Sequence, residues 1–87
     1  MKLMKRKMTR VFAYSVFYEQ APEGGYVASV PVLPGCHTQG DTLEETERNV
    51  KEAIALYLES LSEHGEAIPE EGPSFQGRVT VPLPVSA

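Results

Sequence analysis

The chain has 87 residues, a length that allows one domain with a lean hydrophobic core. Hydrophobic residues make up 41% of it and the mean hydropathy is -0.24, values typical of a soluble globular protein. There is no apolar run of about 20 residues and only one cysteine, so the sequence predicts neither a membrane span nor an internal disulfide. We therefore expect a cytoplasmic protein.

Charge is divided unevenly along the chain. The formal net charge is -4, yet residues 1–10 carry five bases and no acid, which leaves 3 bases against 12 acids in the rest. An acidic domain binds nucleic acid poorly and is suited to bind a basic partner protein. We predict a basic N-terminal tail over residues 1–9 and a single domain over residues 10–87. Scarce asparagine and seven prolines also favour a thermophilic source.

Two apolar runs flank a turn near the N-terminus. Residues 10–19 are rich in aromatic and β-branched side chains, and residues 26–32 form a second run of this kind. Pro-Glu-Gly-Gly lies between them, so the sequence predicts an antiparallel hairpin. Odd-numbered and even-numbered residues of the first run are both mainly apolar, so neither face of this strand is polar. We therefore expect the helix to cover one face of the sheet and a partner chain to cover the other.

A third, short strand follows. Leu33-Pro34-Gly35 predicts a turn, residues 36–39 a strand, and Gly40 a tight entry into the next element. Pro31 lacks an amide donor, which indicates that the second strand lies at an edge or is bulged there.

A long amphipathic helix is predicted over residues 43–64. Thr42 is an N-cap residue, and Glu45 three positions later completes a capping box. Gly65 is a helix stop. The apolar stripe recurs at steps of three or four and consists of Leu43, Thr46, Val50, Ala53, Ile54, Tyr57 and Leu61. Leu56 points away from this stripe, as an isolated exposed leucine or as a contact with another subunit.

The last predicted element is a strand over residues 75–85. Val79, Val81 and Leu83 share one parity, while Pro82 and Pro84 limit the pairing of the segment. The resulting order is β-β-β-α-β, an α+β fold with one long helix on one face of the sheet.

Residues capable of catalysis are few. Cys36 and His37 are neighbours, but adjacent residues of an extended segment point to opposite faces, so they are poorly placed to act as a pair. Asp41, Glu44 and Glu45 resemble a magnesium site, yet acidic residues are expected at a helix start for capping alone. We expect no enzyme activity, no cofactor and no metal.

The residues taken together resemble the HicB family of antitoxins. The similarity covers roughly residues 10–72 and is carried by a long ordered motif. Its residues are Gly25, Tyr26, Pro31, Pro34, Gly35, Cys36, Thr38, Gly40, Asp41, Thr42 and Glu45, which we interpret as structural or partner-facing.

This resemblance implies a partial ribonuclease-H-like sheet without ribonuclease H activity. It implies a partner, the HicA toxin, a small basic RNA-cleaving protein that the antitoxin masks. We expect a homo-oligomer, a dimer or tetramer. We expect no direct DNA binding, because the chain ends at Ala87 where many HicB proteins carry a DNA-binding region. Two alternatives are an oligomeric interaction module without a toxin and a small metal-dependent nuclease using Asp41, Glu44 or Glu45.

Overall fold

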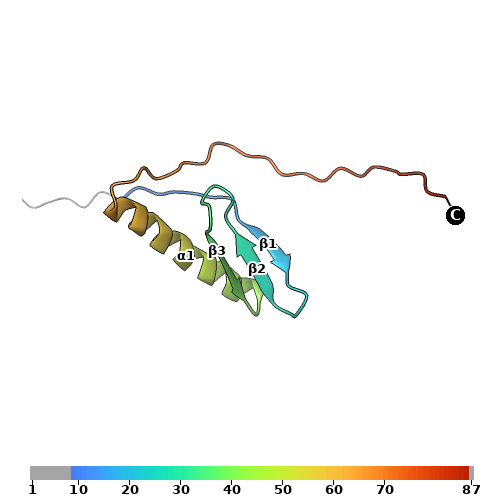
Figure 1. Cartoon of the computed structure of the whole chain (residues 1–87), viewed down its shortest axis with the longest axis horizontal. Coiled ribbons are helices and arrows are strands. Elements are labelled where there is room, and N and C mark those ends of the chain that lie inside the picture. The colour runs from blue at the N-terminus through green and yellow to red at the C-terminus, as the bar shows by residue number, and fades with distance from the viewer. Residues whose placement is uncertain (1–8, 87) are drawn as a thin grey trace, which may run out of the picture.

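The computed structural model describes residues 9–86 and contains three strands followed by one helix (Figure 1). The strands are β1 (Phe17–Gln20), β2 (Tyr26–Ser29) and β3 (His37–Gly40), and the helix is α1 (Leu43–Glu63). The predicted α+β class, with a sheet that precedes one long helix, is confirmed. Apart from its last residue, the predicted basic tail lies outside the described residues.

The sheet is antiparallel throughout, in the order β1-β2-β3. Tyr18 is opposite Ala28, which is opposite Thr38, and this row faces the helix. The neighbouring row, which includes Phe17 and His37, lies on the open face. The predicted hairpin is therefore confirmed.

The strands are shorter than the sequence predicts. The first strand begins at Phe17 and not at residue 10, because β2 ends at Ser29 and no strand of the described chain lies beside the earlier residues. β2 itself is cut short by a turn, in which the amide of Leu33 donates to the carbonyl of Val30 at 3.0 Å. An apolar run predicts an extended segment, but a strand also requires a neighbour to pair with.

The core lies between the sheet and α1, where the helix crosses one face of the sheet (Figure 1). Its buried hydrophobic side chains are Ala28, Val30, Leu33, Cys36 and Val50. Further residues pack against them in part: Tyr14, Val16, Ala53, Ile54, Tyr57 and Leu58. Leu43 was predicted on the buried stripe but is 48% exposed, whereas Thr46 of the same turn is fully buried, so the buried face begins at Thr46. Leu56 is exposed as predicted.

Both ends of α1 are closed by the predicted residues. Thr42 has extended backbone angles, and its hydroxyl accepts from the amide of Glu45 at 3.1 Å. At the other end Gly65 adopts a φ of +67°, which lets the amide of Glu66 donate to the carbonyl of Leu61 at 2.9 Å. The second bond of this Schellman motif runs from Gly65 to Ser62 at 3.1 Å. The helix therefore ends at Glu63, one residue before the predicted boundary.

After the helix the chain returns beside the extended segment that precedes β1 (Figure 1). The hydroxyl of Tyr14 donates to the carbonyl of Pro69 at 2.5 Å, and Arg10 pairs with Glu70. Ser15 donates its amide to a carboxylate oxygen of Glu71 at 2.8 Å. These side-chain contacts attach residues 69–74 to the domain without strand pairing.

The predicted strand over residues 75–85 does not form within the single chain. These residues have no regular secondary structure, and their side chains are exposed. Figure 1 shows the segment running away from the sheet to the C-terminus. Phe75, Gln76 and Gly77 lie near Phe17 of β1 around a shared hollow, but no strand pairing joins the segment to the sheet, so the prediction of a fourth strand in this sheet was wrong.

Candidate partner-binding site

The hairpin turn, the end of β3 and the start of α1 meet at one end of the molecule, where two glycines allow close approach. A Cβ at Gly25 would lie 2.6 Å from the carbonyl oxygen of Gly40, and Gly25 also has a φ of +77°. A Cβ at Gly40 would lie 2.6 Å from Thr46 Oγ1 and 2.8 Å from its backbone nitrogen. Only glycine fits at these two positions without displacing backbone.

A second group of motif residues forms the loop between β2 and β3. Gly35 has a φ of +80°, and the amide of Cys36 donates to the carbonyl of Leu33 at 2.9 Å. The hydroxyl of Tyr57 donates to the carbonyl of Pro34 at 2.9 Å, which ties the loop to the middle of the helix. The loop residues thus fix the sheet against α1.

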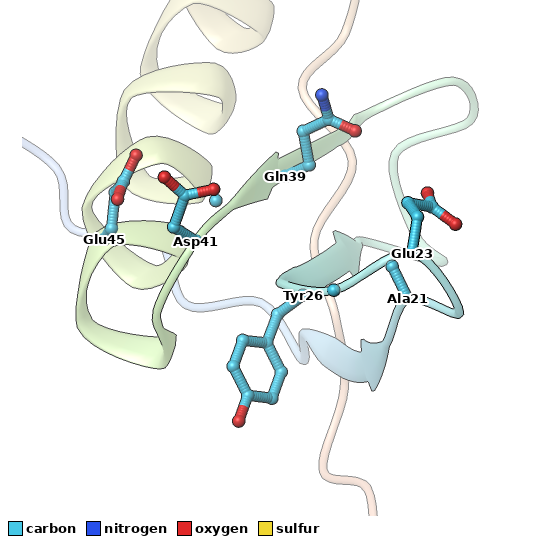
Figure 2. Close-up of a pocket in the computed structure, with 8 residues that line it drawn as sticks. Ala21, Glu23, Tyr26, Gln39, Asp41 and Glu45 are labelled. Atoms are coloured by element: carbon cyan, nitrogen blue, oxygen red, sulfur yellow. The ribbon is translucent and has the colours of Figure 1, made fainter.

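The junction of the hairpin turn with the helix start contains an acidic hollow of about 410 Å³. Figure 2 shows Asp41 and Glu45 close together at the start of the helix, with Glu23 across the hollow on the hairpin turn. Gln39 and Tyr26 contribute the strand side of the lining. Three carboxylates around an open space favour the approach of a lysine or arginine side chain from another molecule.

The structure separates the two residues that most resembled a catalytic pair. Cys36 is buried and His37 is exposed on the opposite face. Burial raises the pKa of the Cys36 thiol, so the protonated, weakly nucleophilic form is favoured at neutral pH. Cys36 therefore acts as a small core residue.

The acids considered as a magnesium site are only partly brought together. Asp41 and Glu45 line the hollow, while Glu44 is exposed outside its lining. In residues 9–86, no group of three or more histidine, cysteine, aspartate or glutamate residues is arranged to hold a metal ion. The helix of this part of the chain is also too polar to cross a membrane.

The motif residues of the sequence analysis fall into structural and lining positions. Gly25, Gly35, Cys36, Gly40 and Thr42 shape the turns, core and cap. The residues at the hollow are Tyr26, Gly40, Asp41 and Glu45. Thr38 is half-buried in β3, and both Pro31 and Pro34 are exposed in the β2–β3 loop. Glu23 was missed because it is distant in sequence from the helix start, although its position in the Glu-Gly-Gly turn indicates proximity to the strand end.

A short sheet beneath one helix, with a packed cysteine and an acidic hollow at its end, defines a small α+β domain. The family model for the HicB-like antitoxin of bacterial toxin–antitoxin systems matches residues 14–80. Because this match covers most of the chain, the protein belongs to the HicB-like antitoxin family.

Relatives from bacteria and archaea support this assignment. A UPF0150 protein of Synechocystis is 47% identical over 71% of this chain and 78% of the relative. A UPF0150 protein of Thermoplasma acidophilum is 50% identical over 67% of this chain and 84% of the relative. Antitoxin HicB 1 of Photorhabdus laumondii is 42% identical over 85% of this chain, but the match spans only 48% of that antitoxin.

Proposed function

We propose that this protein is a cytoplasmic antitoxin that binds a HicA-type RNA-cleaving toxin and neutralises it by covering its active surface. The observation that carries the proposal is the family match over residues 14–80. The resemblance to a named HicB antitoxin over 85% of the chain supports the same role. The protein acts by binding alone, as a homo-oligomer.

The acidic hollow is the proposed contact region for the toxin. Glu23, Asp41 and Glu45 present negative charge at one end of the domain, and residues 11–87 carry 12 acids against 3 bases. HicA toxins are small and basic, so this distribution would accelerate association and orient the two proteins. Motif residues Asp41 and Glu45 are partner-facing in this proposal, whereas Gly25 and Gly40 shape the surface that carries them.

The test is co-expression with a HicA-type toxin in a bacterial host. The wild-type protein should restore growth and co-purify with the toxin. The double variant E23K/E45K reverses charge at the hollow, and we expect it to lose rescue. The matched control E59K/E63K makes the same change in net charge at the far end of α1, and it should rescue growth like the wild type.

Two results would count against parts of the proposal. Rescue by E23K/E45K would move the contact region away from the hollow but leave the antitoxin role in place. A failure of the wild-type protein to form any complex at micromolar concentration would contradict the antitoxin role. That second result would favour the alternative of an interaction module without a toxin.

A further inference from the structure

A second hollow lies at the other end of β1 from the acidic hollow, and we call it the aromatic hollow. It has a volume of about 450 Å³ and lies between the start of β1, the turn after β2 and the connection that follows the helix. Its aromatic, aliphatic and charged lining residues are Phe17, Phe75, Pro31, Val32 and Glu71. Phe75 is 97% exposed, so its ring is available to another molecule.

Glu71 is fixed in position beside this hollow, but its capacity to accept hydrogen bonds is not filled. Its carboxylate accepts from the amide of Ser15 at 2.8 Å and from the hydroxyls of Ser15 and Ser74. A carboxylate has about four lone-pair positions, so these three bonds leave room for a further donor. The hydrogen bonds from the Ser15 hydroxyl and amide also lower the pKa of Glu71, which keeps the carboxylate charged at neutral pH.

A neighbouring group of side chains shows what an aromatic ring and a carboxylate bind together. The guanidinium carbon of Arg10 lies 4.8 Å from the centre of the Phe12 ring, and the same guanidinium pairs with Glu70, the residue before Glu71. No lysine or arginine of residues 9–86 lines the aromatic hollow, and Arg78 is exposed outside the lining. The aromatic hollow therefore offers the same two kinds of group to a cation from another molecule.

Arginine suits the aromatic hollow better than lysine does. The guanidinium is planar, stacks on aromatic rings and donates several hydrogen bonds, whereas the lysine ammonium is a compact and strongly hydrated charge. The aliphatic stem of an arginine side chain can also cover Pro31 and Val32 while its head group remains at Glu71. The aromatic hollow is thus suited to one long, planar, positively charged side chain.

The charge of the domain favours a basic protein as the source of this side chain. Residues 11–87 carry 12 acids against 3 bases, which attracts a basic partner and repels an acidic one. The acidic hollow and the aromatic hollow lie at the two ends of β1, which spans roughly 13 Å. One basic surface can therefore contact both hollows at the same time.

We propose that the aromatic hollow binds an arginine side chain of the toxin. Its guanidinium lies against the rings of Phe17 and Phe75 and donates to the carboxylate of Glu71. The identity of the partner rests on the proposed function, whereas the recognition of a guanidinium group does not. The two parts can therefore be tested separately.

A titration with capped arginine, N-acetyl-arginine amide, tests the aromatic hollow in the full chain without a toxin. By NMR we expect the amides of Phe17, Val32 and Phe75 to shift and to reach saturation at millimolar concentrations of the ligand. Capped citrulline has nearly the same shape without the charge, and it should cause no saturable shift. An equal response to citrulline, or an arginine response confined to the acidic hollow, would overturn the proposal.

Substitutions at Phe75 separate the effect of the aromatic ring from that of apolar volume. Because Phe75 is almost fully exposed, they should leave the stability of the domain unchanged. Phe75→Leu keeps an apolar side chain without the ring, and it should weaken the binding of capped arginine and of the toxin about two- to fivefold. Phe75→Trp should bind both at least as tightly as the wild type, since indole is the best aromatic partner for a cation.

The matched control is Leu83→Ala, which removes an exposed apolar side chain further along the same segment and should change neither affinity. Isothermal titration calorimetry measures binding of the toxin. Toxin affinity that is unchanged in Phe75→Leu would overturn the proposal and leave the antitoxin role standing. A wild-type protein that binds capped arginine at the aromatic hollow but forms no complex with a HicA-type toxin would support the guanidinium site and contradict the proposed function.

Discussion

Individual glycine residues at the hairpin end of the molecule set how closely three elements approach one another. Gly40 touches the backbone and hydroxyl of Thr46, and Gly25 touches Gly40. Thr46 is fully buried, and its hydroxyl donates to the carbonyl of Thr42 at 2.7 Å. The first turn of α1 is therefore held against β3 by contacts that leave no room for one additional carbon.

Replacing Gly40 by alanine should destabilise the domain. The new Cβ would overlap backbone atoms of Thr46 that cannot move independently of α1, so we expect a loss of about 1–3 kcal/mol in the free energy of unfolding. Urea denaturation followed by circular dichroism measures it. Gly72→Ala is the matched control, because a Cβ there meets nothing within 4 Å. Equal stability of both variants would contradict the close-approach argument.

At the scale of elements, caps close both ends of α1, and Glu71 makes most of the side-chain hydrogen bonds that attach the returning connection. Glu71 accepts from the amide and hydroxyl of Ser15 and from the hydroxyl of Ser74. These hydrogen bonds hold the pKa of Glu71 below its ordinary value, and the hydrogen bond from the Ser15 side chain contributes most. Burial and the nearby Glu70 carboxylate raise the pKa of Tyr14, whose hydroxyl donates to the carbonyl of Pro69.

Removal of the N-cap should weaken the helix. We expect Thr42→Ala to lower the free energy of unfolding by about 1 kcal/mol, since the amide of Glu45 loses its acceptor. Thermal denaturation measures the change. The exposed Thr80 serves as the control position, and Thr80→Ala should leave the melting temperature unchanged. A Thr42→Ala protein as stable as the wild type would show that solvent replaces the cap.

The attachment of residues 69–74 should depend on pH in a defined direction. Because the folded pKa of Glu71 is lowered, its contribution is fully present above the unfolded glutamate pKa of about 4.3 and is lost as pH falls through the lower folded value. The amide chemical shift of Ser15 should report this transition at a pH below the ordinary titration range of a glutamate. Glu71→Gln should abolish the transition, and an unchanged titration in that variant would assign it to another acid.

The elements that sequence reasoning located well are those whose signals are local. Thr42 and Gly65 define the helix ends through bonds within a few residues, so α1 was predicted to within one residue. Strand lengths were wrong because pairing depends on a distant neighbour: residues 10–16 are extended but unpaired. The hollow was missed for the same reason, since Glu23 approaches Asp41 only after the hairpin and β3 have formed.

At the scale of the whole molecule, charge governs how the protein meets its proposed partner. The net charge of -4 conceals a far more acidic body, because the basic residues are concentrated before residue 11. Long-range attraction between such a body and a basic toxin is screened by salt. The association rate constant should therefore fall as ionic strength rises, while the dissociation rate changes little.

Stopped-flow or surface-based kinetics between about 50 and 500 mM salt checks this expectation, because the Debye length shortens over that range. The variant E23K/E45K should associate slowly at every salt concentration, and E59K/E63K should retain most of the wild-type dependence. An association rate constant that does not change with salt concentration would show that apolar contacts, and not charges, determine how fast the two proteins associate.

The most direct measurement of the antitoxin role is an RNA-cleavage assay with a purified HicA-type toxin and increasing amounts of this protein. If the protein masks the toxin, cleavage should fall in proportion to the amount added and cease once every toxin molecule is bound. Cleavage that continues at its full rate in the presence of a micromolar excess would contradict the proposed function.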